Sequence, residues 1–171
     1  MVTAQVSQAV PITGSIGFTG QASFDTGSVG TATEVTSWYN TAVNGTSGSF
    51  NILALNSAAT LSPDWFFLTT STINPFWTAG GFSFELLSSS VVTQGPGFVF
   101  VTGTGVVSGP SGFDNTTFDW NFSSQGNPVS TSPVTWTFSA SSDHVPDGST
   151  TLVLLGSALS GLALLKRKFV A

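Results

Sequence analysis

Apolar and polar residues alternate with a period of two between residues 10 and 142, and this pattern most restricts how the chain can fold. Side chains of a strand point alternately to its two faces, so the alternation predicts strands with one buried and one exposed face. Glycine- and proline-containing turns separate the runs. The clearest runs are Ile12–Phe18, Phe82–Leu86 continuing to about Thr93, Phe98–Val107, Phe118–Phe122 and Trp136–Ala140.

The turns between these runs follow from local residue types. Asn44-Gly45, between the runs Glu34–Val43 and Ser47–Leu55, is a strong signal for a two-residue β-hairpin. Pro63 interrupts the apolar run Ala58–Leu68 and predicts an edge or a bend there. The remaining breaks are predicted at Asn74-Pro75, Gly80-Gly81, Gly95-Pro96-Gly97 and Gly109–Gly112.

These runs predict an all-β fold without helices between the strands. Parallel strands need crossover connections of a dozen or more residues, for which the chain has no segment. Strands at a spacing of roughly 12–15 residues are typical of antiparallel sheets. We therefore expect residues 10–142 to form an antiparallel β-sandwich or a flattened barrel.

The last residues of the chain have a different character. Ser149–Leu165 contains 17 residues without a charge, and Lys166, Arg167 and Lys168 follow at once. As a helix this segment spans roughly 26 Å, slightly less than a hydrocarbon core of ~30 Å. A buried core helix has a similar length, but the segment lacks a polar face. Residues 149–171 are thus predicted to be a single C-terminal transmembrane helix whose basic end stays in the cytoplasm.

The residues before the apolar segment add a motif. Val145, Pro146, Asp147 and Gly148 precede the uncharged helix and the basic cluster, and the three parts together resemble a PEP-CTERM sorting signal. The common form of that motif reads Val-Pro-Glu-Pro, and this chain is closer to the Val-Pro-Asp-Ser-Gly and Val-Pro-Asp-Gly-Gly variants. Residues 143–148 are interpreted as a linker and sorting motif.

The resemblance implies how the protein is handled. It implies export, a transient anchor in the inner membrane, recognition near the motif by an exosortase-type membrane enzyme, and release to the cell surface or outside. It also implies a non-catalytic surface or matrix role, in biofilm or with extracellular polysaccharide. The order Gly103-Thr-Gly105, Gly112–Thr116 and Trp120-x-Phe122 is similar to the C-terminal half of many small PEP-CTERM proteins.

An exported chain needs a signal peptide, and Met1–Ala9 has neither a basic start nor an apolar stretch. Ser7-Gln8-Ala9 nevertheless fits the small-x-small pattern that precedes signal cleavage. Residues 1–9 are interpreted as the remnant of a signal peptide, with a disordered leader as the alternative.

Charge is scarce and segregated. The three basic residues all lie in the tail, and all eight acidic residues precede Gly148. Such a body is not attracted to nucleic acid or to an anionic membrane surface. The chain has no cysteine, so it carries no thiol metal site or redox motif. Its 21 aromatic residues (15 Phe, 5 Trp, 1 Tyr) are enough to build a core despite the low charge.

We expect no enzyme activity and no cofactor. The single histidine, His144, lies in the linker, where a catalytic triad cannot hold it, and zinc or iron would need several His or Cys ligands. Two minor alternatives remain. Asp114, Asn115 and Asp119 are candidates for a glycosidase acid pair or a weak calcium site. Trp38, Trp65 and Trp77, with Tyr39, are candidates for a sugar-binding platform. A third alternative, a self-assembling adhesive subunit, requires a long, open, uncharged edge strand.

Overall fold

The fold of a computed structural model is described for residues 9–126 and 133–142. Its strands are β1 (Val10–Pro11), β2 (Ser15–Phe24), β3 (Glu34–Thr46), β4 (Thr60–Leu61), β5 (Trp65–Phe66), β6 (Ile73–Ala79), β7 (Phe82–Gly95), β8 (Phe98–Ser108), β9 (Phe113–Asp114), β10 (Thr116–Gln125) and β11 (Val134–Ser141). One 3-10 helix, η1 (Gly48–Ile52), follows β3. Among these residues there is no helix of the length and apolarity needed to cross a membrane.

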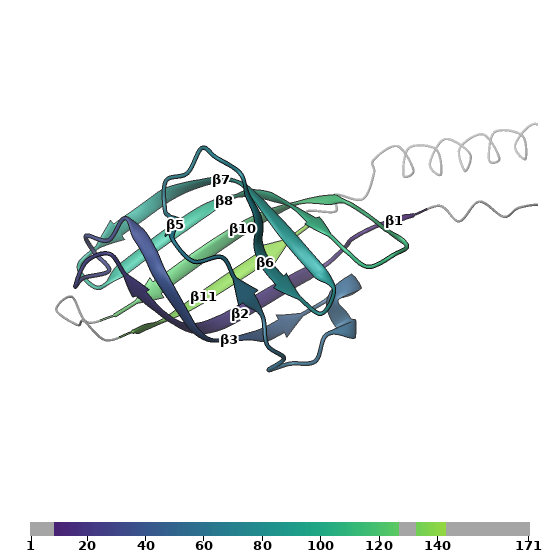
Figure 1. The fold of residues 1–171 in the computed structure, drawn as a ribbon, viewed down its shortest axis with the longest axis horizontal. Coiled ribbons are helices and arrows are strands. Elements are labelled where there is room, and N and C mark those ends of the chain that lie inside the picture. Colours follow the sequence, from purple (N-terminus) through teal and green to yellow (C-terminus); the bar gives the residue numbers. More distant parts are fainter. Residues whose placement is uncertain (1–8, 127–132, 143–171) are drawn as a thin grey trace, which may run out of the picture.

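Nine strands form one sheet in the order β4-β6-β7-β8-β10-β11-β2-β3-β5, and every pairing in it is antiparallel (Figure 1). The first long strand, β2, lies beside the last one, β11, so both occupy the interior of the sheet. The strands predicted from Phe82–Leu86, Phe98–Val107, Phe118–Phe122 and Trp136–Ala140 are confirmed as parts of β7, β8, β10 and β11.

The sheet must curl because its two edges are joined by a short piece of chain. β4 and β5 are the opposite edges of the sheet, yet only Ser62, Pro63 and Asp64 separate them in sequence. Pro63 lies at the predicted bend, and Asp64 adopts a left-handed conformation there with φ of 56°. The Ser62 amide donates to the Phe76 carbonyl at 2.8 Å, while the Ser62 carbonyl accepts from Trp38 Nε1 at 2.7 Å. This segment therefore holds β6 and β3 together.

The predicted sandwich is wrong, since a single curled sheet encloses the core and no second large sheet packs on it in the described residues. The structure is nearer to the flattened-barrel alternative. The antiparallel prediction has one exception, the two-residue parallel pair of β1 and β9, in which Val10 lies opposite Phe113. The connection between these two parallel strands comprises residues 12–112, which is most of the domain.

Two predicted turns are wrong. Asn44-Gly45 lies within β3, at a shift of register where Gly17 pairs with Gly45 and Phe18 with Val43. The pair forms a β-bulge because β3 continues along β2. The expected second hairpin strand is replaced by η1, which buries Phe50 against Phe82 and Phe118, with ring centroids 4.8 and 5.7 Å apart.

Asn74-Pro75 likewise lies inside β6, next to its irregular pairing with β7, rather than in a loop. The Gly80-Gly81 and Gly109–Gly112 turns are confirmed between strands, and Pro96-Gly97 forms the turn between β7, which ends at Gly95, and β8.

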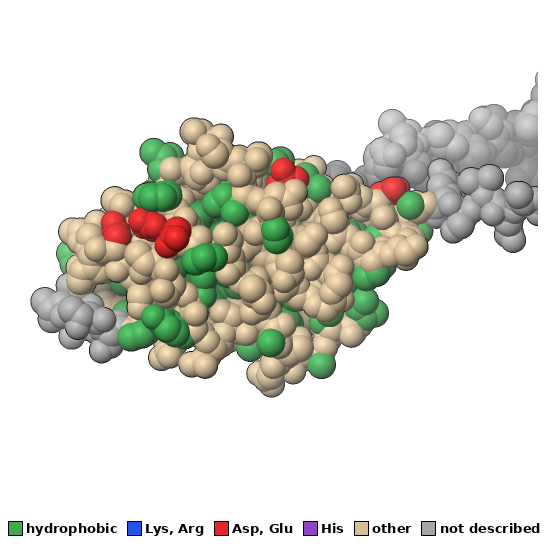
Figure 2. Space-filling model, in the orientation of Figure 1, with side chains coloured by type: hydrophobic (Ala, Val, Ile, Leu, Met, Phe, Trp, Pro, Cys, Tyr) green, Lys and Arg blue, Asp and Glu red, His purple; other side chains and the backbone are tan. Residues whose placement is uncertain are grey.

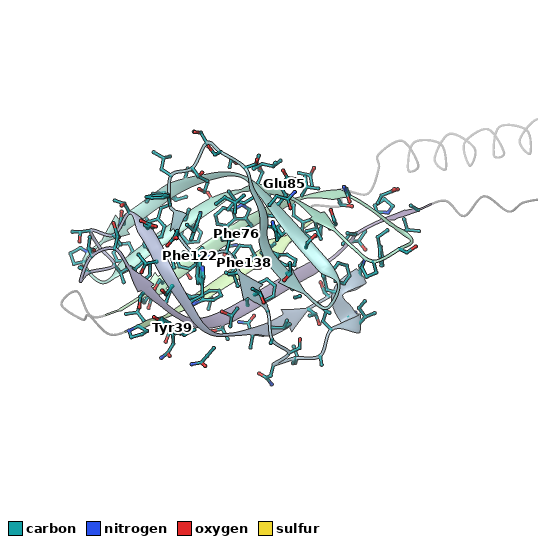
Figure 3. The ribbon with its side chains drawn as sticks, in the orientation of Figure 1. Tyr39, Phe76, Glu85, Phe122 and Phe138 are labelled. Atoms are coloured by element: carbon teal, nitrogen blue, oxygen red, sulfur yellow. The ribbon has the colours of Figure 1, made fainter. Side chains whose placement is uncertain are left out.

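Aromatic side chains fill the curl. Phe76, Phe122 and Phe138 lie inside it in Figure 3, whereas Tyr39 and Glu85 lie on its outside. The rings pack mostly edge to face, as for Trp65 and Phe122 at 5.1 Å, with some stacked pairs, as for Trp120 and Phe138 at 5.6 Å. Such pairs add about 0.5–1.5 kcal/mol each beyond the burial of area. The aromatic core therefore supplies the stability that a weakly charged chain lacks from ion pairs.

Candidate functional site

The predicted sorting motif (Val145, Pro146, Asp147 and Gly148) and the basic cluster (Lys166, Arg167 and Lys168) lie outside the described residues, as do the predicted helix and residues 1–8 of the leader. The structure does show where the described part of the β domain ends before this motif. β11 ends at Ser141, four residues before Val145.

Ser142, the last described residue, is fixed to Gly14. The Ser142 amide donates to the Gly14 carbonyl at 3.1 Å, and the Gly14 amide donates to Ser142 Oγ at 3.1 Å. Gly14 has a φ of 101°, and a Cβ on it would overlap the backbone of Ser47. Glycine is needed at this position for both reasons. The chain is thus held in place up to three residues before the motif.

We call this end of the domain the exit end. It contains the β1–β9 pair, residues 46–55, the Gly80-Gly81 turn and Ser142. Backbone hydrogen bonds join its parts: the Ser47 amide donates to Ser15 and the Ser49 amide to Thr13, both at 2.8 Å. The first and the last described residues both lie here (Figure 1).

The proposed sugar platform of Trp38, Trp65 and Trp77 is contradicted. Trp65 and Trp77 have 0% exposure, and Trp38 is half-buried, stacked on Trp65 at 6.2 Å. These side chains face the inside of the curl, so they offer no ring face to a sugar. Tyr39 alone among the four candidates is exposed, at 43%, beside Gln21 of β2, its register partner. Hydrogen bonds with the hydroxyls of Ser23 and Ser37 lower the pKa of Tyr39.

The candidate acids occupy different places. Asp114 belongs to β9 and lies opposite Pro11, whereas Asp119 belongs to β10 and lies between Thr104 of β8 and Ser141 of β11. Asp119 lines a shallow groove on the outer face, and neither Asp114 nor Asn115 lines it. In residues 9–126 and 133–142 no three His, Cys, Asp or Glu side chains are grouped so as to hold a metal ion.

The groove at Asp119 is lined largely by uncharged polar groups of the outer face. Its walls come from β8, β10 and β11, and the side chains Thr102, Thr104, Asn121 and Ser141 supply hydroxyl and amide groups beside Phe100. A second hollow on the same face is lined by Ser123, Gln125, Thr135, Trp136 and Thr137. These groups can form hydrogen bonds with a neutral polar polymer.

Sequence reasoning missed an apolar hollow at the end opposite to the exit. Ala32, Thr33, Phe66, Phe67, Leu68, Val91 and Gln94 line it. Phe66 and Leu68, which belong to the apolar run Ala58–Leu68, are 53% and 73% exposed. Gln94 Nε2 closes one side by donating to the Val29 and Ala32 carbonyls at 2.8 and 2.7 Å. No local pattern signals this hollow, because it depends on where the segment after β5 crosses β7.

Asp25 lies at that same end, in the turn from β2 to β3. Partial burial raises its pKa, but hydrogen bonds from the Thr33 hydroxyl, at 2.7 Å, and from the amides of Thr33 and Glu34 outweigh this and lower the pKa overall. Figure 2 shows acidic side chains gathered at this end of the domain, beside hydrophobic ones.

Comparison with known families identifies the tail. A family model described as the VPDSG-CTERM motif matches residues 144–169. The chain therefore carries a C-terminal sorting signal, a variant of the PEP-CTERM type, as the sequence predicted. No curated protein and no solved structure matches the chain.

Proposed function

We propose, from the premise that the chain ends in a VPDSG-CTERM sorting signal, that an exosortase-type membrane enzyme processes it near Val145–Gly148 after export. The protein then acts at the cell surface or outside the cell as a non-catalytic structural component. The match at residues 144–169 carries this proposal. An apolar helix over residues 149–165 anchors the chain in the inner membrane until processing.

The outer face supports a neutral extracellular polysaccharide as the partner. Hydroxyl and amide groups line the groove around Asn121, and no Lys or Arg occurs in the β domain. Anionic polymers would be repelled by the acidic side chains, whereas neutral sugars accept and donate hydrogen bonds without a charge.

The alternatives receive less support. A carbohydrate-binding module is less supported because Trp65 and Trp77 are buried. A glycosidase is less supported because Asp119 lines the outer groove and Asp114 does not. A self-assembling adhesive subunit would need a long open edge strand. In the described part of the chain the two edge strands, β4 and β5, have two residues each.

Processing can be tested by the mass of the mature protein. The full chain is produced, behind a functional signal peptide, in a bacterium with an exosortase system and in the same strain without the enzyme. We expect loss of the tail only where the enzyme is present. Pro146→Ala should leave most of the product uncut, because the extended conformation of Val145 before a proline is lost.

Asp143→Asn, which lies two residues before the motif, is the matched control and should be cut like the unaltered chain. An intact tail in the strain that contains the enzyme, or equal cutting in both strains, would contradict the proposal.

A further inference from the structure

We infer that the exit end of the β domain rests on the membrane surface, with Val10, Ile52 and Leu55 in contact with a neutral phospholipid bilayer, while the opposite end points away from the cell. The inference rests on the proposed function, since it takes residues 149–165 to cross the membrane. It adds an orientation and a contact surface that the sorting signal itself does not specify.

The first support is exposed apolar area at the exit end. The opposite end also exposes apolar side chains, so the length of the tether decides between the two ends. Val10, Ile52 and Leu55 are 57%, 67% and 59% exposed. Exposed large apolar side chains that share one end of a domain are typical of contact surfaces, whereas scattered single ones are ordinary. One acidic side chain, Asp114, lies beside them in the β1–β9 pair, so a neutral bilayer suits this end better than an anionic one.

The second support is that these side chains are held in place. Ile52 is the last residue of η1, and η1 is anchored from inside by Phe50, which is fully buried against Phe82 and Phe118. The Thr13 amide donates to Ser49 Oγ at 3.0 Å, which ties η1 to the segment between β1 and β2. The apolar surface is therefore pre-formed beside Gly14, where Ser142 is fixed.

The third support is the length of chain between the fold and the membrane. Only residues 143–148 separate Ser142 from the apolar segment that begins at Ser149. Fully extended, this connection spans at most about 25 Å. β11, with eight residues, is itself roughly 26 Å long. The connection is too short to run back along β11 and also place the opposite end on the bilayer.

The tether therefore keeps the exit end within reach of the membrane and presents the other end outward. That outward end carries Asp25 and the apolar hollow formed by Phe66, Leu68 and Val91. β1, paired with β9, lies at the exit end as well.

The chain contains no cysteine, so single labels can be placed without other changes. The full-length protein is reconstituted into phosphatidylcholine vesicles as three variants: Ile52→Cys and Leu55→Cys at the exit end, and Leu68→Cys at the opposite end. Each carries a thiol-linked fluorophore. Leu68 is the matched control because its exposure, 73%, is close to the 67% of Ile52. Nitroxide-bearing lipids then quench any label that touches the bilayer.

We expect several-fold stronger quenching at positions 52 and 55 than at position 68. Equal quenching at all three positions, or none at 52 and 55 in protein that floats with the vesicles, would overturn the inference and leave the proposed anchor intact. Protein that fails to float with the vesicles would overturn the membrane anchor, and the inference with it. An unchanged tryptophan emission spectrum shows that each labelled variant is folded.

Discussion

The inner and outer faces of the sheet differ in side-chain type and burial more than any two of its strands do. In β10, Phe118, Trp120 and Phe122 are buried, while the alternate residues Asp119 and Asn121 are exposed. The neighbouring strand β11 repeats the pattern, with Trp136 and Phe138 inside and threonines outside. In the body, aromatic packing thus occupies one face and hydroxyl and amide groups the other, with almost no charge on either.

The β domain has no basic residue to protect the edges of its sheet. Proteins commonly protect sheet edges with lysine, and residues 1–165 contain none. Here the sheet ends in two-residue edge strands, β4 and β5, and the segment around Ser62 joins β6 to β3. The aromatic side chains of the inner face form the core of the curl, and the outer face is exposed to solvent.

The sharpest test of the contrast compares neighbouring residues of β10. Phe122→Ala should lower the free energy of unfolding by about 3–5 kcal/mol, since it leaves a cavity among Trp65, Trp38 and Trp136. Asn121→Ala, on the other face, should change it by less than about 0.5 kcal/mol. Urea unfolding followed by tryptophan fluorescence measures both.

For retention of the folded protein on a neutral extracellular polysaccharide, we expect Asn121→Ala to have the larger effect of the two substitutions. It should weaken binding, because the Asn121 amide lines the outer groove. Similar losses of stability for the two variants would show that the two faces contribute equally.

Two glycines give a second, smaller contrast. A Cβ on Gly103 would overlap the Ser88 carbonyl oxygen and come within 2.8 Å of Trp120 Cζ2, whereas a Cβ on Gly45 would meet nothing within 4 Å. Gly103→Ala should therefore destabilise the domain by about 1–3 kcal/mol. Gly45→Ala should instead stabilise it slightly, by about 0.4–1 kcal/mol, because its φ is not in the left-handed region and alanine restricts the unfolded chain. A thermal melt that ranks Gly45→Ala as the worse substitution would contradict this packing.

The sequence predicted the features that depend on neighbours in the chain. Alternation located β7, β8, β10 and β11, and the sorting signal was visible because its parts are contiguous. It misjudged Asn44-Gly45, since whether that pair makes a hairpin or a bulge depends on the strand beside it. The sequence did not predict the curl for the same reason. β4 and β5 pair with β6 and β3, and no local pattern identifies these partners.

The same limit explains the candidate sites. Trp65 is a candidate for the sugar platform, yet its two-residue strand turns it into the curl, while Phe66 beside it points outward. Asp114 and Asp119 are five residues apart in sequence, but the break before β10 assigns them to different sheets. Which side chains are buried, and which lie together, depends on the pairing of strands that are distant in sequence, so local patterns could not predict either.

Asp25 gives the smallest expected effect and tests whether any charge on the outside matters to the fold. Its pKa is lower in the folded state, so its contribution to stability is present above its ordinary pKa and is lost as the pH falls through the lowered value. Asp25→Asn should therefore cost no more than about 1 kcal/mol at pH 7, because solvent screens this exposed carboxylate although it accepts hydrogen bonds from Thr33 and Glu34. At pH 2 the difference from the unaltered protein should be smaller, because the stability that this carboxylate contributes is lost as the pH falls below its ordinary pKa and through the lowered one. Thr33→Val, which removes the 2.7 Å hydrogen bond, should reproduce part of this pH dependence in urea unfolding. If Asp25→Asn lowers the free energy of unfolding equally at both pH values, the charge of Asp25 does not stabilise the turn from β2 to β3. The outer face would then stabilise the fold without electrostatics.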